Sequence, residues 1–103
     1  MDVNKIAEEM SRVAVQRCLN DRTKKTDIVS LLKHLSTEVV ESAMAYQAWM
    51  SGDCPEQNFT SELGDVLAIV FIICGTNSID VEKIINDTYT KNLKRSQKKG
   101  DKL

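Results

Sequence analysis

Hydrophobic positions recur every three or four residues along most of this chain of 103 residues, which is the spacing of amphipathic helices. The pattern predicts helical segments over Val3 to Leu19, Ile28 to Met50, Glu56 to Cys74 and Val81 to Ser96. Short polar connectors separate them. We therefore expect an all-α fold: one domain over residues 1–103 that forms an antiparallel four-helix bundle.

The connectors carry residue types that begin and end helices. Asp27 and Asp80 directly precede the second and fourth segments, where an acidic side chain can cap a helix. Gly52 is a stop signal and Pro55 a start signal between the second and third segments. Gly75 is expected to end the third helix. The polar residues after Ser96 are expected to form a frayed tail over 97–103.

The second segment places a carboxylate inside its apolar stripe. Glu38 lies in the stripe that joins Leu35 to Ser42, and Glu41 lies on its flank. Burying a charge is costly unless it is paired or binds a metal. An isolated pair of this kind is commonly a boundary pair whose carboxylates reach water, and this segment by itself leaves that interpretation open.

The third segment repeats the arrangement. Glu62 and Asp65 open a stripe that continues through Ile69 and Ile72. Residues three apart on a helix are separated by about 60° and about 4.5 Å along the axis, so each pair can offer oxygens to one point. If the two pairs face each other, four negative charges meet, and such a cluster requires cations.

The ligand type limits the choice of cation. Carboxylate oxygens suit Mg²⁺ or Mn²⁺, and Mg²⁺ commonly shares its coordination shell with substrate phosphates. Di-iron bundles use Glu-x-x-His motifs, whereas both motifs here end in an acid. His34, one turn before Glu38, is interpreted as a surface histidine or a support for a ligand rather than as a ligand.

The fourth segment ends in polar residues on its apolar stripe. The stripe begins with Val81 and Ile85 and leads to Asn92 and Arg95, with Lys91 beside it. This pattern has two interpretations: a helix end that frays toward solvent, or the anion-binding side of a phosphate site.

Composition limits the partners and the compartment. The net charge of -1 provides no general attraction to nucleic acid or to anionic membranes. The N-terminus lacks the apolar core of a secretory signal, and the apolar run from Val66 to Cys74 is too short to span a bilayer. Three cysteines without C-x-x-C spacing fit reduced thiols. We expect a cytoplasmic protein without nucleic-acid or membrane partners.

The same apolar run points to self-association. Residues 66–74 are apolar on every side of the predicted helix, so the helix needs cover all round. Four helices of this length supply too little cover, which predicts a homo-oligomer, either a homodimer or a homotetramer.

Two motifs together resemble a known family. "LSTEVVE" followed by "SELGDVLAIV" resembles the Glu-x-x-Glu … Glu-x-x-Asp signature of the MazG-like all-α nucleoside triphosphate pyrophosphohydrolases. "NSIDVEKII" and "KNLKR" resemble the last helix of that superfamily. The resemblance covers about Asp27 to Arg95, and the first segment agrees with it only as an amphipathic helix.

The resemblance implies an oligomeric bundle that binds Mg²⁺, or Mn²⁺ in its place, and cleaves a nucleoside triphosphate to a monophosphate and pyrophosphate. It assigns metal binding to four acids, with Glu41 and Glu38 also catalytic and Glu41 acting on the attacking water. The four acids are Glu38, Glu41, Glu62 and Asp65. The alternative is a non-catalytic helical oligomer that binds a nucleotide or a metal.

The same resemblance assigns phosphate contacts to Asn92 and Arg95. Many relatives place a lysine one turn before the asparagine, where this chain has Thr88. Lys91 is the candidate that replaces it.

Overall fold

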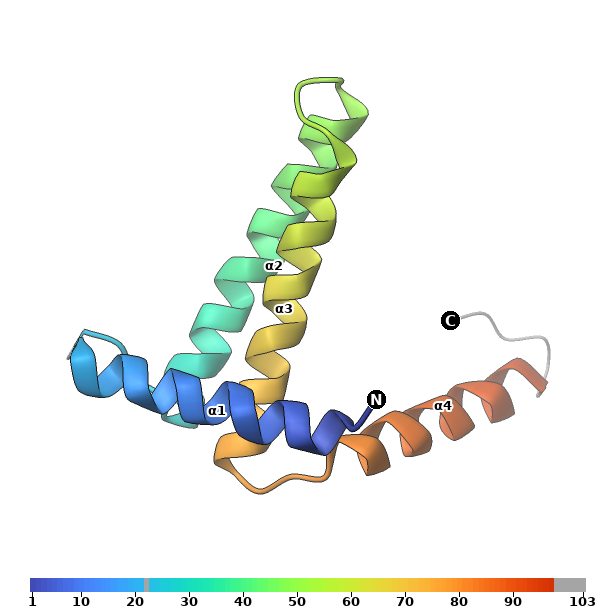
Figure 1. Cartoon of the computed structure of the whole chain (residues 1–103). Coiled ribbons are helices and arrows are strands. Elements are labelled where there is room, and N and C mark those ends of the chain that lie inside the picture. The colour runs from blue at the N-terminus through green and yellow to red at the C-terminus, as the bar shows by residue number, and fades with distance from the viewer. Residues whose placement is uncertain (22, 98–103) are drawn as a thin grey trace.

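The computed structural model describes residues 1–21 and 23–97, and within them the chain forms four α-helices (Figure 1). These are α1 (Val3–Asn20), α2 (Ile28–Met50), α3 (Glu56–Thr76) and α4 (Val81–Gln97). The all-α class and the four predicted segments are confirmed. The tail predicted beyond the fourth segment falls, over 98–103, outside the described residues.

Most of the predicted end signals act as expected. The Asp27 carboxylate accepts a hydrogen bond from the Ser30 amide at 3.1 Å, and the Asp80 carboxylate accepts one from the Lys83 amide at 3.0 Å. Both bonds satisfy amides that the first turn of a helix leaves without a partner. Gly52 follows α2 with a φ of 79°, a conformation that favours glycine.

The prediction for Gly75 is wrong. α3 continues through this residue to Thr76, and its C-cap is Asn77. Gly75 instead lies where α1 crosses α3. A Cβ atom at this position would lie 2.3 Å from the Ala7 carbonyl oxygen and 2.7 Å from the Ser11 side chain. The glycine therefore allows two helices to approach closely, which is a tertiary requirement and not a turn requirement.

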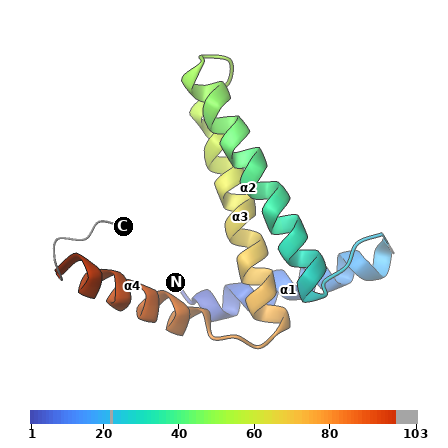
Figure 2. The same ribbon diagram turned by 180° about the vertical axis from the view of Figure 1, so that it is seen from behind.

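The helices α2 and α3 form an antiparallel hairpin and lie side by side from both directions of view (Figures 1 and 2). At the loop end, Tyr46, Trp49 and Phe59 contact one another, with ring centroids 5.3 to 6.0 Å apart. At the open end, α1 crosses α3, and Ala7, Cys74 and Val81 form a small buried cluster. The hairpin is thus held at both ends, with its middle left open to one side.

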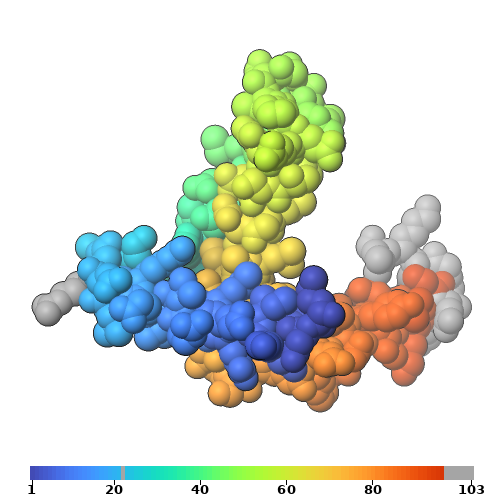
Figure 3. All heavy atoms as spheres, viewed as in Figure 1, coloured from blue at the N-terminus to red at the C-terminus, as the bar shows by residue number. Residues whose placement is uncertain are grey.

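Only the beginning of α4 is packed. The Asn4 side chain accepts a hydrogen bond from the Val81 amide at 2.8 Å and donates one to the Asp80 carboxylate at 3.0 Å. α4 contacts α1 and from this junction extends away from the hairpin (Figure 3). The radius of gyration is 16.3 Å, whereas a compact domain of this length has about 13 Å. The chain's own α4 does not lie along α2 and α3.

The hairpin leaves much apolar surface uncovered. By length and composition alone, α3 is long and apolar enough to cross a membrane, and little of it is buried in the single chain. The core helix of a soluble protein has the same composition, and α3 packs between α1 and α2. Large apolar side chains are also exposed on α2, α3 and α4: Val39, Val40, Met44, Leu63, Leu67, Val70, Ile84, Ile85, Tyr89 and Leu93.

Candidate metal centre

Three of the predicted acids meet in the middle of the hairpin. Glu38 and Glu41 on α2 and Glu62 on α3 each offer a carboxylate oxygen, and these oxygens lie within 4.8 Å of one another. The spacing of three residues brings the two α2 acids to one side, and the antiparallel packing of α3 brings the third opposite them. The prediction that the two motifs face each other agrees with this geometry.

Two oxygens of this cluster are buried without a partner. Neither Glu38 Oε2 nor Glu62 Oε2 has a hydrogen bond within the described residues. The Glu38 side chain is only 14% exposed. A buried acceptor without a donor is costly, and the cost is greater for a carboxylate. Such an arrangement of oxygens fits a hard divalent cation, because a cation compensates charges that the protein itself leaves unpaired.

Charge crowding changes the proton affinity of the site. The pKa of Glu41 is raised above its ordinary value. The main cause is Glu38, through a hydrogen bond and through charge repulsion, and burial and the charge of Asp65 add to it. The pKa of Glu62 is also raised, first by burial and then by the charges of Glu41 and Asp65. Both shifts mean that this site penalises negative charge in the absence of a cation.

Asp65 lies at the edge of this centre. It is exposed and is not one of the acids whose oxygens meet within 4.8 Å. Its charge nevertheless contributes to the raised pKa values of Glu41 and Glu62. The structure therefore brings three of the four predicted ligands together and leaves the fourth close by on α3.

His34 supports the cluster from one turn away. Its Nε2 atom lies 3.1 Å from Glu38 Oε1, while its own side chain is 59% exposed. His34 contacts Oε1 of Glu38, whereas Oε2 is the oxygen without a hydrogen-bond partner among the described residues. The exposed ring and this contact fit both interpretations of His34, as a surface histidine and as a support for a ligand.

The polar residues of α4 lie elsewhere. Lys91 and Arg95 are exposed and Asn92 is half-buried, on the part of α4 that extends away from the hairpin. The single chain therefore does not bring these three residues to the acids. Helical periodicity places residues on one face of a helix but does not determine the direction of that helix in the fold. Here the α3–α4 connection and the Asn4 contacts determine the direction of α4.

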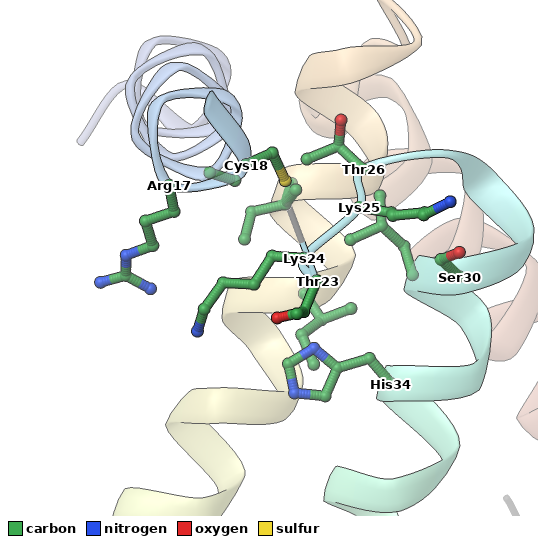
Figure 4. Close-up of a pocket in the computed structure, with 12 residues that line it drawn as sticks. Arg17, Cys18, Thr23, Lys24, Lys25, Thr26, Ser30 and His34 are labelled. Atoms are coloured by element: carbon green, nitrogen blue, oxygen red, sulfur yellow. The ribbon is translucent and has the colours of Figure 1, made fainter. Parts of the chain in front are cut away.

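A cationic pocket next to His34 was not foreseen. It has a volume of about 370 Å³ and lies between α1, residues 23–26 of the connector, α2 and α3 (Figure 4). Arg17, Lys24 and Lys25 line it together with His34. The sequence does place several cations in the connector and at the end of α1. Their spacing along the chain, however, does not indicate that they surround a cavity.

Comparison with protein-family models identifies the relationship. Residues 26–99 match the model described as the MazG nucleotide pyrophosphohydrolase domain, which is most of the chain. The chain belongs to this MazG family. A comparison with curated proteins gave no match, and a comparison with solved structures gave none either.

Membership in the MazG family agrees with the resemblance described from the two acidic motifs. The matched region contains α2, α3 and α4, and hence every acid of the cluster and all three polar residues of α4. It begins just before α2, so α1 and most of the connector that lines the cationic pocket fall outside it.

Proposed function

We propose that this protein is an Mg²⁺-dependent nucleoside triphosphate pyrophosphohydrolase, with Mn²⁺ as a possible substitute. The observation that carries the proposal is the cluster of Glu38, Glu41 and Glu62, in which two buried carboxylate oxygens have no partner. Four acids with no cation among them would repel one another at neutral pH, so the cluster is suited to bind one. The family is consistent with such a reaction.

Glu38, Glu41 and Glu62 would hold the metal, and we propose that Asp65, one turn further along α3, joins them. When bound, the metal supplies charge neutralisation for the phosphates and a lower pKa for a bound water. His34 keeps Glu38 oriented through their contact of 3.1 Å. A fixed ligand direction matters, because a loosely held carboxylate would lose part of its metal affinity.

In the reaction, the oxygen of a water molecule forms a bond to the α-phosphorus while the bond from that phosphorus to the α–β bridging oxygen breaks. Pyrophosphate leaves with the electron pair of the broken bond. Glu41 is the candidate base that accepts the proton of the water. Its carboxylate is exposed to the solvent side of the cluster, where a water molecule can reach it.

The phosphate contacts proposed for Lys91, Asn92 and Arg95 require a second copy of the chain, because α4 leaves its own hairpin. The exposed apolar side chains of α2, α3 and α4 support such an assembly, since a soluble monomer rarely leaves so many uncovered. We infer a homodimer or homotetramer in which the hairpin is covered by helices of a neighbouring copy.

The decisive experiment measures pyrophosphate release from a panel of nucleoside triphosphates with Mg²⁺, with Mn²⁺ and with excess chelator. We expect release with at least one nucleotide, dependent on the metal and abolished by Glu62→Gln. Glu56→Gln is the matched control, because Glu56 is an exposed acid in the first turn of the same helix. Orthophosphate as the first product, or full activity in chelator, would contradict the proposal.

A further inference from the structure

The pocket beside His34 is lined by cations that the metal centre does not use. Arg17 comes from the last turn of α1, and Lys24 and Lys25 come from the connector. Thr23, Thr26 and Ser30 also line the pocket, although the Thr23 hydroxyl donates to Asp21, and none of the lining residues is acidic. Guanidinium and ammonium groups around one cavity are donors that bind phosphate oxygens.

These cations are not neutralised by close partners. Among the described residues, the ion pairs are His34 with Glu38 and Lys83 with Asp87, and neither includes a cation of the pocket other than His34. Asp21 and Asp27 act on Lys24 and Lys25 from beyond ion-pair distance, and neither acid lines the pocket. Arg17, Lys24 and Lys25 together outnumber these two acids, so the pocket retains an excess of positive charge.

The side chains do not all point the same way. Figure 4 shows Arg17 and Lys24 extending to the same side of the pocket, whereas Lys25 extends in the opposite direction. Arg17 and Lys24 therefore form the charged wall, and Lys25 lies apart from it.

The pocket adjoins the metal centre. His34 lines the pocket, and its ring also contacts Glu38 of the acid cluster at 3.1 Å. Ser30, His34 and Glu38 follow one another at intervals of four residues on α2, so each step is about 6 Å along the axis. A phosphate chain held at the acid cluster by its α-phosphate needs only one such step to bring its distal phosphates to the pocket.

We propose that Arg17 and Lys24 bind the pyrophosphate portion of the nucleotide, that is, the β- and γ-phosphates of the substrate and then the pyrophosphate product. The inference rests on the proposed function for its biological meaning. The pocket is formed within one chain, whereas Lys91, Asn92 and Arg95 lie away from the acids of their own chain.

The test measures binding of inorganic pyrophosphate by calorimetry to the full-length protein in excess chelator, where the metal centre cannot contribute. Wild-type protein should bind pyrophosphate, with an affinity that falls as the salt concentration rises. Arg17→Gln/Lys24→Gln should weaken binding at least about tenfold, because each variant side chain loses a charge-assisted contact. Lys25→Gln is the matched control and should change affinity less than about threefold.

The inference is overturned if Arg17→Gln/Lys24→Gln binds pyrophosphate with unchanged affinity while circular dichroism shows intact helix content. It is also overturned if the wild type does not bind pyrophosphate. Glu62→Gln separates this inference from the proposed function. It should abolish turnover while leaving pyrophosphate binding in chelator intact. If the wild type shows no turnover with any nucleotide but binds pyrophosphate through Arg17 and Lys24, the pocket stands and the proposed reaction fails.

Kinetics distinguish binding of the substrate from binding of the product alone. If the pocket holds the β- and γ-phosphates of the substrate, Arg17→Gln/Lys24→Gln should raise KM for the nucleotide and also weaken inhibition by pyrophosphate. If KM is unchanged and only product inhibition weakens, the assignment to the substrate is overturned.

Discussion

The charged form of Glu41 is penalised mainly by Glu38, and that of Glu62 first by burial and then by the neighbouring carboxylates. A carboxyl whose folded-state pKa is raised favours the folded state when it is protonated at low pH, and this contribution is lost as the pH rises through the raised pKa. At neutral pH without metal, the cluster therefore lowers the free energy of unfolding. A bound cation reverses the effect, since the charged carboxylates then become ligands.

This yields a prediction at the scale of one residue. Glu41→Gln should melt at the same temperature as the wild type or higher in chelator, because it removes one charge from the crowded site. In Mg²⁺ it should lose most of the stabilisation that the wild type gains; a ligand at 100 times its Kd contributes ~2.7 kcal/mol. Thermal melts with and without Mg²⁺ measure both effects. Glu56→Gln should behave like the wild type, and a destabilised Glu41→Gln in chelator would contradict the reasoning.

At the scale of helices, two contacts determine how the elements are joined. The crossing of α1 over α3 depends on Gly75, whose missing Cβ leaves room for the Ala7 carbonyl oxygen and the Ser11 side chain. The start of α4 depends on Asn4, which bonds both the Val81 amide and the Asp80 carboxylate. Both contacts link residues that are far apart in the sequence.

Gly75→Ala should destabilise the protein by about 1 to 3 kcal/mol, because overpacking forces the two helices apart. Gly64→Ala is the matched control on the same helix. A Cβ atom at Gly64 meets nothing within 4 Å, and alanine in a helix is favoured over glycine by about 0.5 to 1 kcal/mol. Chemical denaturation of both variants measures the difference, and equal effects would show that the crossing does not depend on Gly75.

The Asn4 contact predicts a pH dependence at the start of α4. The pKa of Asp80 is lowered, first by the hydrogen bond from Asn4 and then by that from the Lys83 amide. Its contribution to stability is therefore present above the ordinary aspartate pKa and is lost as the pH falls through the lower folded value. Protection factors of the first-turn amides of α4, which remove the intrinsic pH dependence of exchange, should be unchanged from pH 7 to 5 and should fall once the pH drops below the ordinary aspartate pKa. At neutral pH, Asn4→Ala should exchange faster in the first turn of α4 while α2 and α3 keep wild-type rates.

At the scale of the whole molecule, the single chain is open. Its radius of gyration exceeds that of a compact domain, α4 extends away from the hairpin, and the exposed fractions of Val40 and Leu67 are 57% and 60%. Apolar side chains on two helices of one hairpin contribute most when another subunit covers them. The site and the assembly are therefore coupled if α4 of one copy reaches the acids of another.

Light scattering should find the wild type as a homodimer or homotetramer at micromolar concentration. Val40→Asp/Leu67→Asp should dissociate it, because burying two unpaired charges at an interface is costly. Val15→Asp on α1 is the control, since Val15 is also exposed but lies outside the hairpin. A well-folded wild-type monomer would contradict the predicted oligomer.

The coupling can be tested by mixing a variant of reduced activity with an inactive variant. Arg95→Ala should lower kcat/KM about ten- to a hundredfold, since a charge-assisted contact of ~1.5–3 kcal/mol is lost. Mixed with Glu62→Gln after subunit exchange, it should regain activity, because a mixed oligomer contains sites with both residues intact. Truncation after Gln97 should change kcat/KM little. Failure of the mixture to regain activity would place α4 outside the site.

The sequence by itself determined the features that depend on near neighbours along the chain. The helix bounds other than the end of α3, the Asp27 and Asp80 caps and the pairing of acids three residues apart follow from local spacing and hydrogen bonding, and the structure agrees with them. The tertiary structure alone decided which acids meet, with Asp65 left at the edge, and what Gly75 is needed for. It also decided the direction of α4 and enclosed the cationic pocket. These features depend on how the helices cross and where the connectors run. Both bring together residues that are far apart in the sequence, so spacing along the chain does not predict them.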